Sequence, residues 1–246
     1  MIQQISLYEA DPLLHLFHKN FPKLLASHEL KYCGGKPLRN RFHLGIVGSR
    51  RPTPESKTLI ENLLKKLSGH SFRIISGGAL GVDAQAHHFA LQNGIPTYSW
   101  IVGDPEKPTP FSNFQIFKKI LEDPNSSILT PDCLYRNKNQ NLEPYFWIER
   151  NYWLAANVDA LLVIQAKEKS GTWWTVKACH DFGIPVYALS GSLTEKTYSG
   201  NNLMITNTYA EAVHSIDHFS EEILNKIKLF NEISEKSKEG EPLVIH

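Results

Sequence analysis

The stretches HLGIVGSRRPTPESKTLIENLLKKL (residues 43–67) and FRIISGGALGVDAQAHHFALQN (residues 72–93) decide the fold. Each begins with a short apolar run, passes through a turn that contains glycine, and continues with apolar residues at helical spacing. Such a run predicts a buried strand, and the residues after the turn predict a helix. Two of these units in succession are typical of a parallel sheet that is covered by helices on both faces.

The same alternation continues to residue 189. Further strands are expected at TYSWIV (97–102), SSILT (126–130), DALLVIQ (159–165) and PVYAL (185–189). Further helices are expected at NFQIFKKILED (113–123), IERNYWLAAN (148–157) and WWTVKACHDF (173–182). The pattern predicts an α/β chain with one Rossmann-like, doubly wound and mainly parallel sheet of six or more strands, in a single domain.

Three segments are expected along the chain. Residues 1–40 form an N-terminal lead-in segment, in which residues 11–30 have helical spacing and a second helical piece starts at Pro22. Residues 41–215 form the Rossmann-like domain. Residues 216–246 carry a last amphipathic helix, FSEEILNKIKLFNEI (219–233), and a polar tail. The loop SGSLTEKTYSGNN (190–202) separates the last clear strand from that helix.

The composition favours a cytoplasmic globular protein. The 26 Lys and Arg residues balance 25 Asp and Glu, so a nucleic-acid site must be a local patch. The cysteines Cys33, Cys133 and Cys179 form no Cys-x-x-Cys pair, which fits a reducing compartment and predicts no metal site. No basic and apolar leader starts the chain and no run of about 18 apolar residues occurs, so no membrane association is expected.

Three strand-to-helix turns have the chemistry of a phosphate site. In an open parallel sheet these turns meet at the carboxyl edge, where helix N-termini expose N–H groups that suit anions. The site residues that the sequence predicts are Gly48, Ser49 and Arg50 after the first strand, Gly77 and Gly78 after the second, and Lys169, Ser170 and Gly171 after DALLVIQ, with Arg150 and Asn151 just upstream. Several anion-friendly loops at one rim favour a ligand with several phosphates.

Features typical of catalysis are few, so no enzyme activity and no cofactor are expected. No G-x-S-x-G elbow, no G-x-x-x-x-G-K-[ST] loop and no H-E-x-x-H motif is present. Asp83 and His87 are four residues apart on a predicted helix, and a local structural hydrogen bond is the favoured interpretation.

With these motifs in order, the chain resembles the DprA/Smf DNA-processing family over residues 21–206. The resemblance rests on FPKLL (21–25) with YCGGKPL (32–38), GIVGSR (45–50), SGGALGVDAQAHHFAL (76–91), ERN (149–151), residues 163–178 and SGNNL (199–203). The most specific of these stretches is residues 76–91, which is similar to the family pattern SGxAxGID-x-x-AH-x-x-AL.

The resemblance implies a Rossmann-like protein that forms a homodimer, binds single-stranded DNA and helps to load a RecA-type recombinase during natural transformation. It assigns DNA contacts to Ser49, Arg50, Gly77 and Gly78, and then to Arg150, Asn151, Ser170 and Gly171. The chain also departs from the family pattern. An arginine of the second loop is replaced within Ala79-Leu80-Gly81, Tyr152 stands for another arginine, and Ser190 stands for a proline. Neither the N-terminal helical domain nor the C-terminal winged-helix domain of many members is expected.

Two alternatives to DNA binding remain open at this point. The same crevice suits a sensor of a small nucleotide, which the near-neutral charge favours. Cytokinin-activating phosphoribohydrolases share the architecture and carry a PGGxGTxxE loop, but SGTWWTVKA (170–178) lacks the double glycine and the carboxylate. For DNA, the aromatic side chains Phe111, Phe114, Trp173 and Trp174 are candidates to stack on bases.

Overall fold

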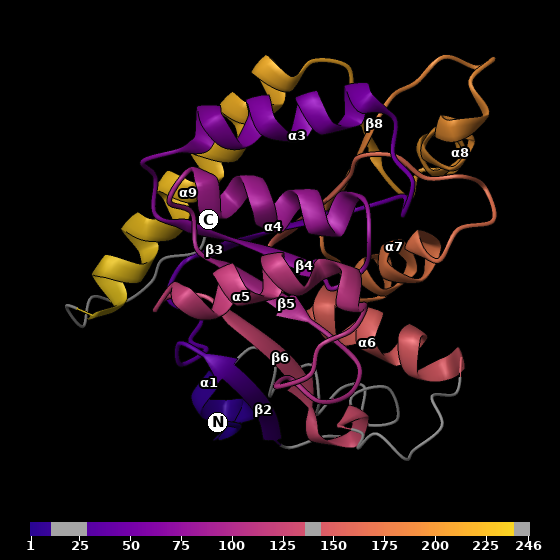
Figure 1. The fold of residues 1–246 in the computed structure, drawn as a ribbon. Helices are drawn as coiled ribbons and strands as arrows, with labels where there is room; N and C mark the ends of the chain where they lie inside the picture. The colour runs from indigo at the N-terminus through magenta and orange to yellow at the C-terminus, as the bar shows by residue number, and fades with distance from the viewer. Residues whose placement is uncertain (11–28, 136–143, 239–246) are drawn as a thin grey trace.

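The computed structural model describes residues 1–10, 29–135 and 144–238. Its centre is one nine-stranded sheet in the order β1-β2-β6-β5-β4-β3-β7-β8-β9 (Figure 1). The strands are β1 (Gln3–Ser6), β2 (Glu29–Gly34), β3 (Phe42–Val47), β4 (Phe72–Gly77), β5 (Thr97–Trp100), β6 (Ser127–Pro131), β7 (Ala160–Val163), β8 (Val186–Leu189) and β9 (Glu211–Val213). All neighbouring pairs from β6 to β9 are parallel, while the β1–β2 and β2–β6 pairs are antiparallel. The predicted Rossmann-like α/β fold is confirmed.

The helices pack on both faces of the sheet (Figure 1). They are α1 (Leu7–Ala10), α3 (Pro54–Leu67), α4 (Val82–Gln92), α5 (Phe114–Glu122), α6 (Pro144–Ala156), α7 (Thr172–Asp181), α8 (Ser199–Thr206) and α9 (Ile216–Lys238), with short 3-10 helices η1 (Phe111–Asn113), η2 (Asp132–Leu134) and η3 (Lys196–Tyr198).

Alternation along the central strands explains the two layers. Leu44 and Ile46 of β3 point into a core with α3, α4 and α9, whereas Val47 points into the core beneath α6 and α7. All six residues of β3 and all six of β4 are buried, as expected for strands covered on both faces. Packing against two layers therefore stabilises the apolar runs from which the fold was predicted.

The structure adds elements that the sequence pattern did not predict. Glu29 and Leu30, expected at the end of a helical stretch, begin strand β2, and the glycine-containing stretch Tyr32–Gly34 completes that strand. The loop predicted at residues 190–202 contains η3 and the start of α8. The short sequence of β2 has no clear strand period. Backbone pairing to β6 therefore decides its extended conformation. The helical prediction for residues 11–28 lies outside the described residues.

No helix among the described residues has both the length and the apolar composition needed to span a bilayer.

Candidate phosphate-binding pocket

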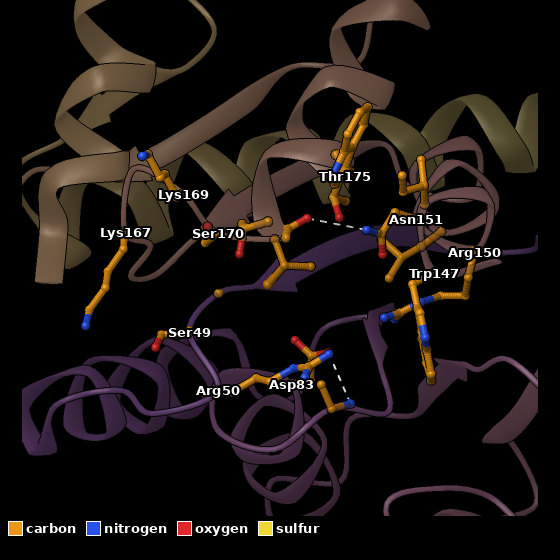
Figure 2. A pocket seen from close by; sticks show the side chains of 18 residues that line it. Ser49, Arg50, Asp83, Trp147, Arg150, Asn151, Lys167, Lys169, Ser170 and Thr175 are labelled. Carbon is orange, nitrogen blue, oxygen red and sulfur yellow. Dashed lines mark hydrogen bonds between the residues drawn. The ribbon is translucent and has the colours of Figure 1, made fainter. Parts of the chain in front are cut away.

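The sheet order creates a crevice at the carboxyl ends of β3 and β7. These strands are neighbours, but the chain proceeds from β3 toward β4 and from β7 toward β8, in opposite directions along the sheet. The loops that follow them therefore separate, which is where doubly wound folds bind ligands. A pocket of about 570 Å³ opens at this point. Figure 2 shows Ser49 and Arg50 on one side of it, Lys167, Lys169 and Ser170 opposite, and Trp147 and Arg150 at one end.

The loop after β3 is held in place by the chain that follows β7. The backbone N–H of Ser49 donates to the carbonyl of Gln165 at 2.6 Å, and the N–H of Thr53 donates to Oε1 of Gln165 at 2.9 Å. A Cβ atom on Gly48 would lie 2.8 Å from the same Gln165 carbonyl oxygen. Glycine is therefore required at residue 48 because the two loops approach closely at their backbones.

The loop after β4 rests on the loop after β3. Gly81 has a φ of +78°, and a Cβ atom there would lie 2.3 Å from the carbonyl oxygen of Ser49. That carbonyl accepts a 3.0 Å hydrogen bond from the N–H of Val82, the first residue of α4. From inside the core, Nε2 of His87 donates to the carbonyl of Gly77 at 2.8 Å. The second loop is thus a rigid support for Ser49 and Arg50.

A buried arginine forms the floor at one end of the pocket. Arg150 on α6 is 8% exposed, and its Nη1 donates to the carbonyl of Trp100 at 3.3 Å. A Cβ atom on Gly77 would lie 1.8 Å from that Nη1. Gly77 therefore contributes by leaving room for a guanidinium group. Nε of Arg150 has no hydrogen-bond partner among the described residues.

Asp83 lies beside this arginine and lines the same pocket. Its Oδ2 accepts from the N–H of Ala79 at 3.3 Å. Burial raises the pKa of Asp83 to about 6, although the charge of Arg150 acts in the opposite direction. Burial also lowers the pKa of Arg150. Instead of the predicted hydrogen bond to Asp83, His87 donates from Nε2 to the carbonyl of Gly77. Its other ring nitrogen, Nδ1, lies 2.7 Å from Oγ1 of Thr97.

The third loop, between β7 and α7, supplies the opposite wall. Asn201 on α8 is fully buried and accepts the N–H of Ala166 at 2.6 Å, while its Nδ2 lies within 3.2 Å of the carbonyls of Val163, Ile164 and Leu189. Nδ2 of Asn151 approaches the carbonyl of Gly171 at 3.4 Å. These contacts fix the loop that carries Lys167, Lys169 and Ser170. Oγ of Ser170 is buried and lacks a hydrogen-bond partner among the described residues.

Eight of the ten residues predicted for the site line this pocket. They are Gly48, Ser49, Arg50, Arg150, Asn151, Lys169, Ser170 and Gly171. The other two are buried and do not line it: Gly77 faces Arg150, and Gly78 lines a smaller adjoining pocket. The structure thus gives Gly77 a supporting position, while ligand contact by the ten residues remains a prediction.

Sequence patterns did not identify Trp147, which lines the pocket from α6. It lies one helical turn before Arg150, and that spacing was the available clue. Of the aromatic candidates, Trp174 is 43% exposed and lines the pocket. Trp173 instead packs edge-on against Tyr209, with 5.8 Å between the ring centroids. Phe111 and Phe114 lie outside it.

The pocket is locally basic although the whole chain is nearly neutral. Its lining includes Arg50, Arg150, Lys167 and Lys169, and Asp83 is the one carboxylate among the described lining residues. The exposed Arg50 can offer a bidentate donor to a phosphate, and the lysines can add mobile charges. Within the described part of the chain, no group of three or more His, Cys, Asp or Glu side chains could hold a metal ion.

Comparisons with known proteins agree with the fold and with the resemblance. DNA processing protein DprA of Bacillus subtilis is 28% identical over 180 residues, which cover 73% of this chain and 58% of that protein. The structure of DNA processing protein A from Helicobacter pylori, described for its single-stranded DNA binding mode, matches with a TM-score of 0.73 at 25% identity and covers 92% of this chain and 97% of that one. DprA from Streptococcus pneumoniae gives the same TM-score at 23% identity, covering 92% and 74%.

The chain spans about half the length of the curated relatives that it matches, from 36% to 60%. The family model described as DNA recombination-mediator protein A matches residues 13–224, which is most of the chain. With the fold, the motif order and this match in agreement, the chain belongs to the DNA recombination-mediator protein A family, known as DprA or Smf.

Proposed function

We propose that this chain binds single-stranded DNA through the pocket between the loops after β3 and β7, and that it acts in DNA processing during natural transformation. The observation that carries the proposal is the excess of four cationic side chains over one carboxylate in the pocket lining. The Helicobacter pylori relative, described for its single-stranded DNA binding mode, supports the choice of ligand.

The chemistry of the pocket suits a sugar–phosphate backbone. Arg50 is exposed and can follow a phosphate, whereas Arg150 is buried and fixed, so it holds charge at a defined position. Trp147 and Trp174 supply ring surface beside these cations. Such a combination of cations and aromatic rings binds single strands with little sequence preference, because every base has a face on which a ring can stack.

We propose binding without chemistry at this pocket. Its described lining holds neither histidine nor cysteine, and its one carboxylate, Asp83, is buried beside Arg150 and not free at the pocket surface. A general acid–base reaction needs a titrating group positioned on the substrate, and a hydrolase of the phosphoribohydrolase kind needs a free carboxylate. Family membership likewise makes a small-nucleotide sensor the less favoured alternative.

Membership of the family also supports three wider proposals: a homodimer, a RecA-type recombinase as partner, and a cytoplasmic location. The first is tested by sedimentation analysis of the purified chain. The second is tested by measuring whether the chain speeds recombinase assembly on a strand coated with single-strand binding protein.

Fluorescence anisotropy with a labelled oligonucleotide tests the main proposal. Single-stranded DNA should bind more tightly than duplex, and the affinity should fall steeply with salt because lysines and arginines release counterions from the phosphates. If the protein binds no oligonucleotide at low salt but binds a mononucleotide, the pocket serves a small ligand and DNA binding is wrong.

A further inference from the structure

A second, more apolar pocket adjoins the phosphate pocket. It has a volume of about 260 Å³ and shares Arg50, Ala79, Trp147 and Arg150 with the larger one. Its remaining walls are mainly apolar and come from the loop after β4 and from the chain after β5, including Leu80 and Pro110. A ligand that leaves the phosphate pocket past Arg50 therefore enters an apolar compartment of a size that holds a flat ring.

Two residues with exposed aromatic rings come shortly after Pro110, a residue that lines this compartment. Phe111 is 81% exposed and Phe114 is 49% exposed. Their ring centroids are 5.6 Å apart with an interplanar angle of 23°, so they stack on each other instead of packing into the core. Together they present a preformed apolar platform to solvent, next to Pro110 of the compartment wall.

The platform is fixed relative to the phosphate loops. Asn113, between the two phenylalanines, is 5% exposed, and its Nδ2 donates to the carbonyls of Gly78 and Ala79 at 2.9 and 3.0 Å. Ala79 lines both pockets. The rings are therefore connected to the ligand pocket through one buried amide, and their positions do not depend on a mobile linker.

We propose that the single strand continues from the phosphate pocket through the apolar compartment, and that a further base stacks on the Phe111–Phe114 platform. This inference rests on the proposed function and extends it, because it assigns a polymer and the direction in which it leaves the pocket. A nucleic-acid strand suits the surface because a cation and two apolar surfaces follow one another along it: Arg50 lies at the junction, the compartment follows, and the rings come last. A mononucleotide would not reach the platform.

Binding of oligo-dT as a function of length tests the inference. The lengths run from about 3 to about 20 nucleotides, and the proteins are the wild type and the double variant Phe111→Ala/Phe114→Ala. For long oligonucleotides the double variant should bind roughly 5- to 150-fold more weakly, which is the range that loss of one stacked base gives. For the shortest ones the two proteins should bind equally, because the phosphate pocket is intact.

Three further variants separate stacking from other effects. Phe111→Trp should keep the affinity for long oligonucleotides, and Phe111→Leu, which is apolar but not aromatic, should lower it. Leu193→Ala removes another side chain that is 93% exposed and should change nothing. The slope of log affinity against log salt should be the same in the double variant and the wild type, because stacking releases no counterions.

The outcomes distinguish the inference from the function on which it rests. If the wild type binds no oligonucleotide of any length, both fail. If the wild type binds but the double variant has the same affinity at every length, the inference alone is overturned. If the double variant differs from the wild type in oligomeric state by sedimentation and binds all lengths as before, the platform is a contact between copies of the chain, which also overturns it.

Discussion

The backbone N–H of Ser49 and the carbonyl of Gln165 are joined by a 2.6 Å hydrogen bond, which connects the loops after β3 and β7 at the point where the sheet order reverses. The side chain of Gln165 makes the second connection, through its 2.9 Å contact with the N–H of Thr53. The two walls of the pocket therefore form one rigid unit at their base. A ligand that bridges Arg50 and Lys169 meets a preformed site and loses little free energy to ordering the backbone.

Replacement of Arg50 by alanine is expected to weaken binding of single-stranded DNA for all sequences. Arg50 is exposed at the pocket rim and contacts phosphates in this proposal, so its loss should reduce the salt slope by about one unit. Fluorescence anisotropy over a salt series measures both quantities. Arg51→Ala is the matched control, because Arg51 is equally charged, exposed and adjacent but does not line the pocket. Equal effects of the two substitutions would show that only general charge matters.

Three glycines near the pocket should respond differently to alanine. Gly171→Ala should be nearly neutral for stability, because no atom lies within 4 Å of the added Cβ. Gly81→Ala should lower the free energy of unfolding by about 1–3 kcal/mol, because its φ is +78° and the Cβ meets the backbone of Ser49. Gly77→Ala should reduce DNA binding, because the Cβ displaces the guanidinium of Arg150. Urea unfolding and anisotropy, run on all three variants, separate these effects, and equal stability of Gly81→Ala and Gly171→Ala would contradict the loop geometry.

The sequence predicted much of the fold because its central strands are fully buried. The run of β3 was recognisable without the structure, since burial on both faces leaves a nearly continuous apolar pattern. The 14 residues of α3 were recognisable because the buried residues on its one packed face recur at helical spacing. Strand β2 was missed because pairing with β6, a contact distant in the chain, decides its conformation. Among site residues, Arg50 follows a strand directly and was evident. Trp147 lies inside a helix, where an aromatic residue that faces a pocket has the same pattern as one that faces the core.

Replacement of Asn201 by alanine is expected to destabilise the fold by about 2–4 kcal/mol. Its side chain is fully buried and satisfies the N–H of Ala166 and carbonyls at the ends of β7 and β8, so its removal leaves several buried polar groups without partners. Urea unfolding followed by circular dichroism measures the loss. Asn207→Ala, at an exposed position just after α8, is the control and should stay within about 0.5 kcal/mol of the wild type. A loss of similar size in both variants would contradict the assigned role of Asn201.

His87 is expected to make the fold less stable as the pH falls below its ordinary pKa. Burial lowers the pKa of His87 to about 4 in the folded chain, while the unfolded chain keeps a value near 6.5. Between these values the unfolded state binds one more proton than the folded state at this residue, so the free energy of unfolding decreases by up to about 1.4 kcal/mol per pH unit on acidification. Above about pH 6.5 the contribution vanishes, because His87 is neutral in both states.

The variant His87→Gln isolates this contribution from other titrating groups. Glutamine keeps a donor for the carbonyl of Gly77 but does not titrate, so the variant should lose less stability than the wild type between about pH 6.5 and pH 4. The comparison is needed because Asp83, whose pKa burial raises to about 6, acts in the opposite direction: its contribution is present at low pH and is lost as the pH rises toward 6. Urea unfolding of both proteins at a series of pH values gives the difference. Parallel stability curves would show that His87 binds a proton equally well in the folded and unfolded chains, contrary to its position between Gly77 and Thr97.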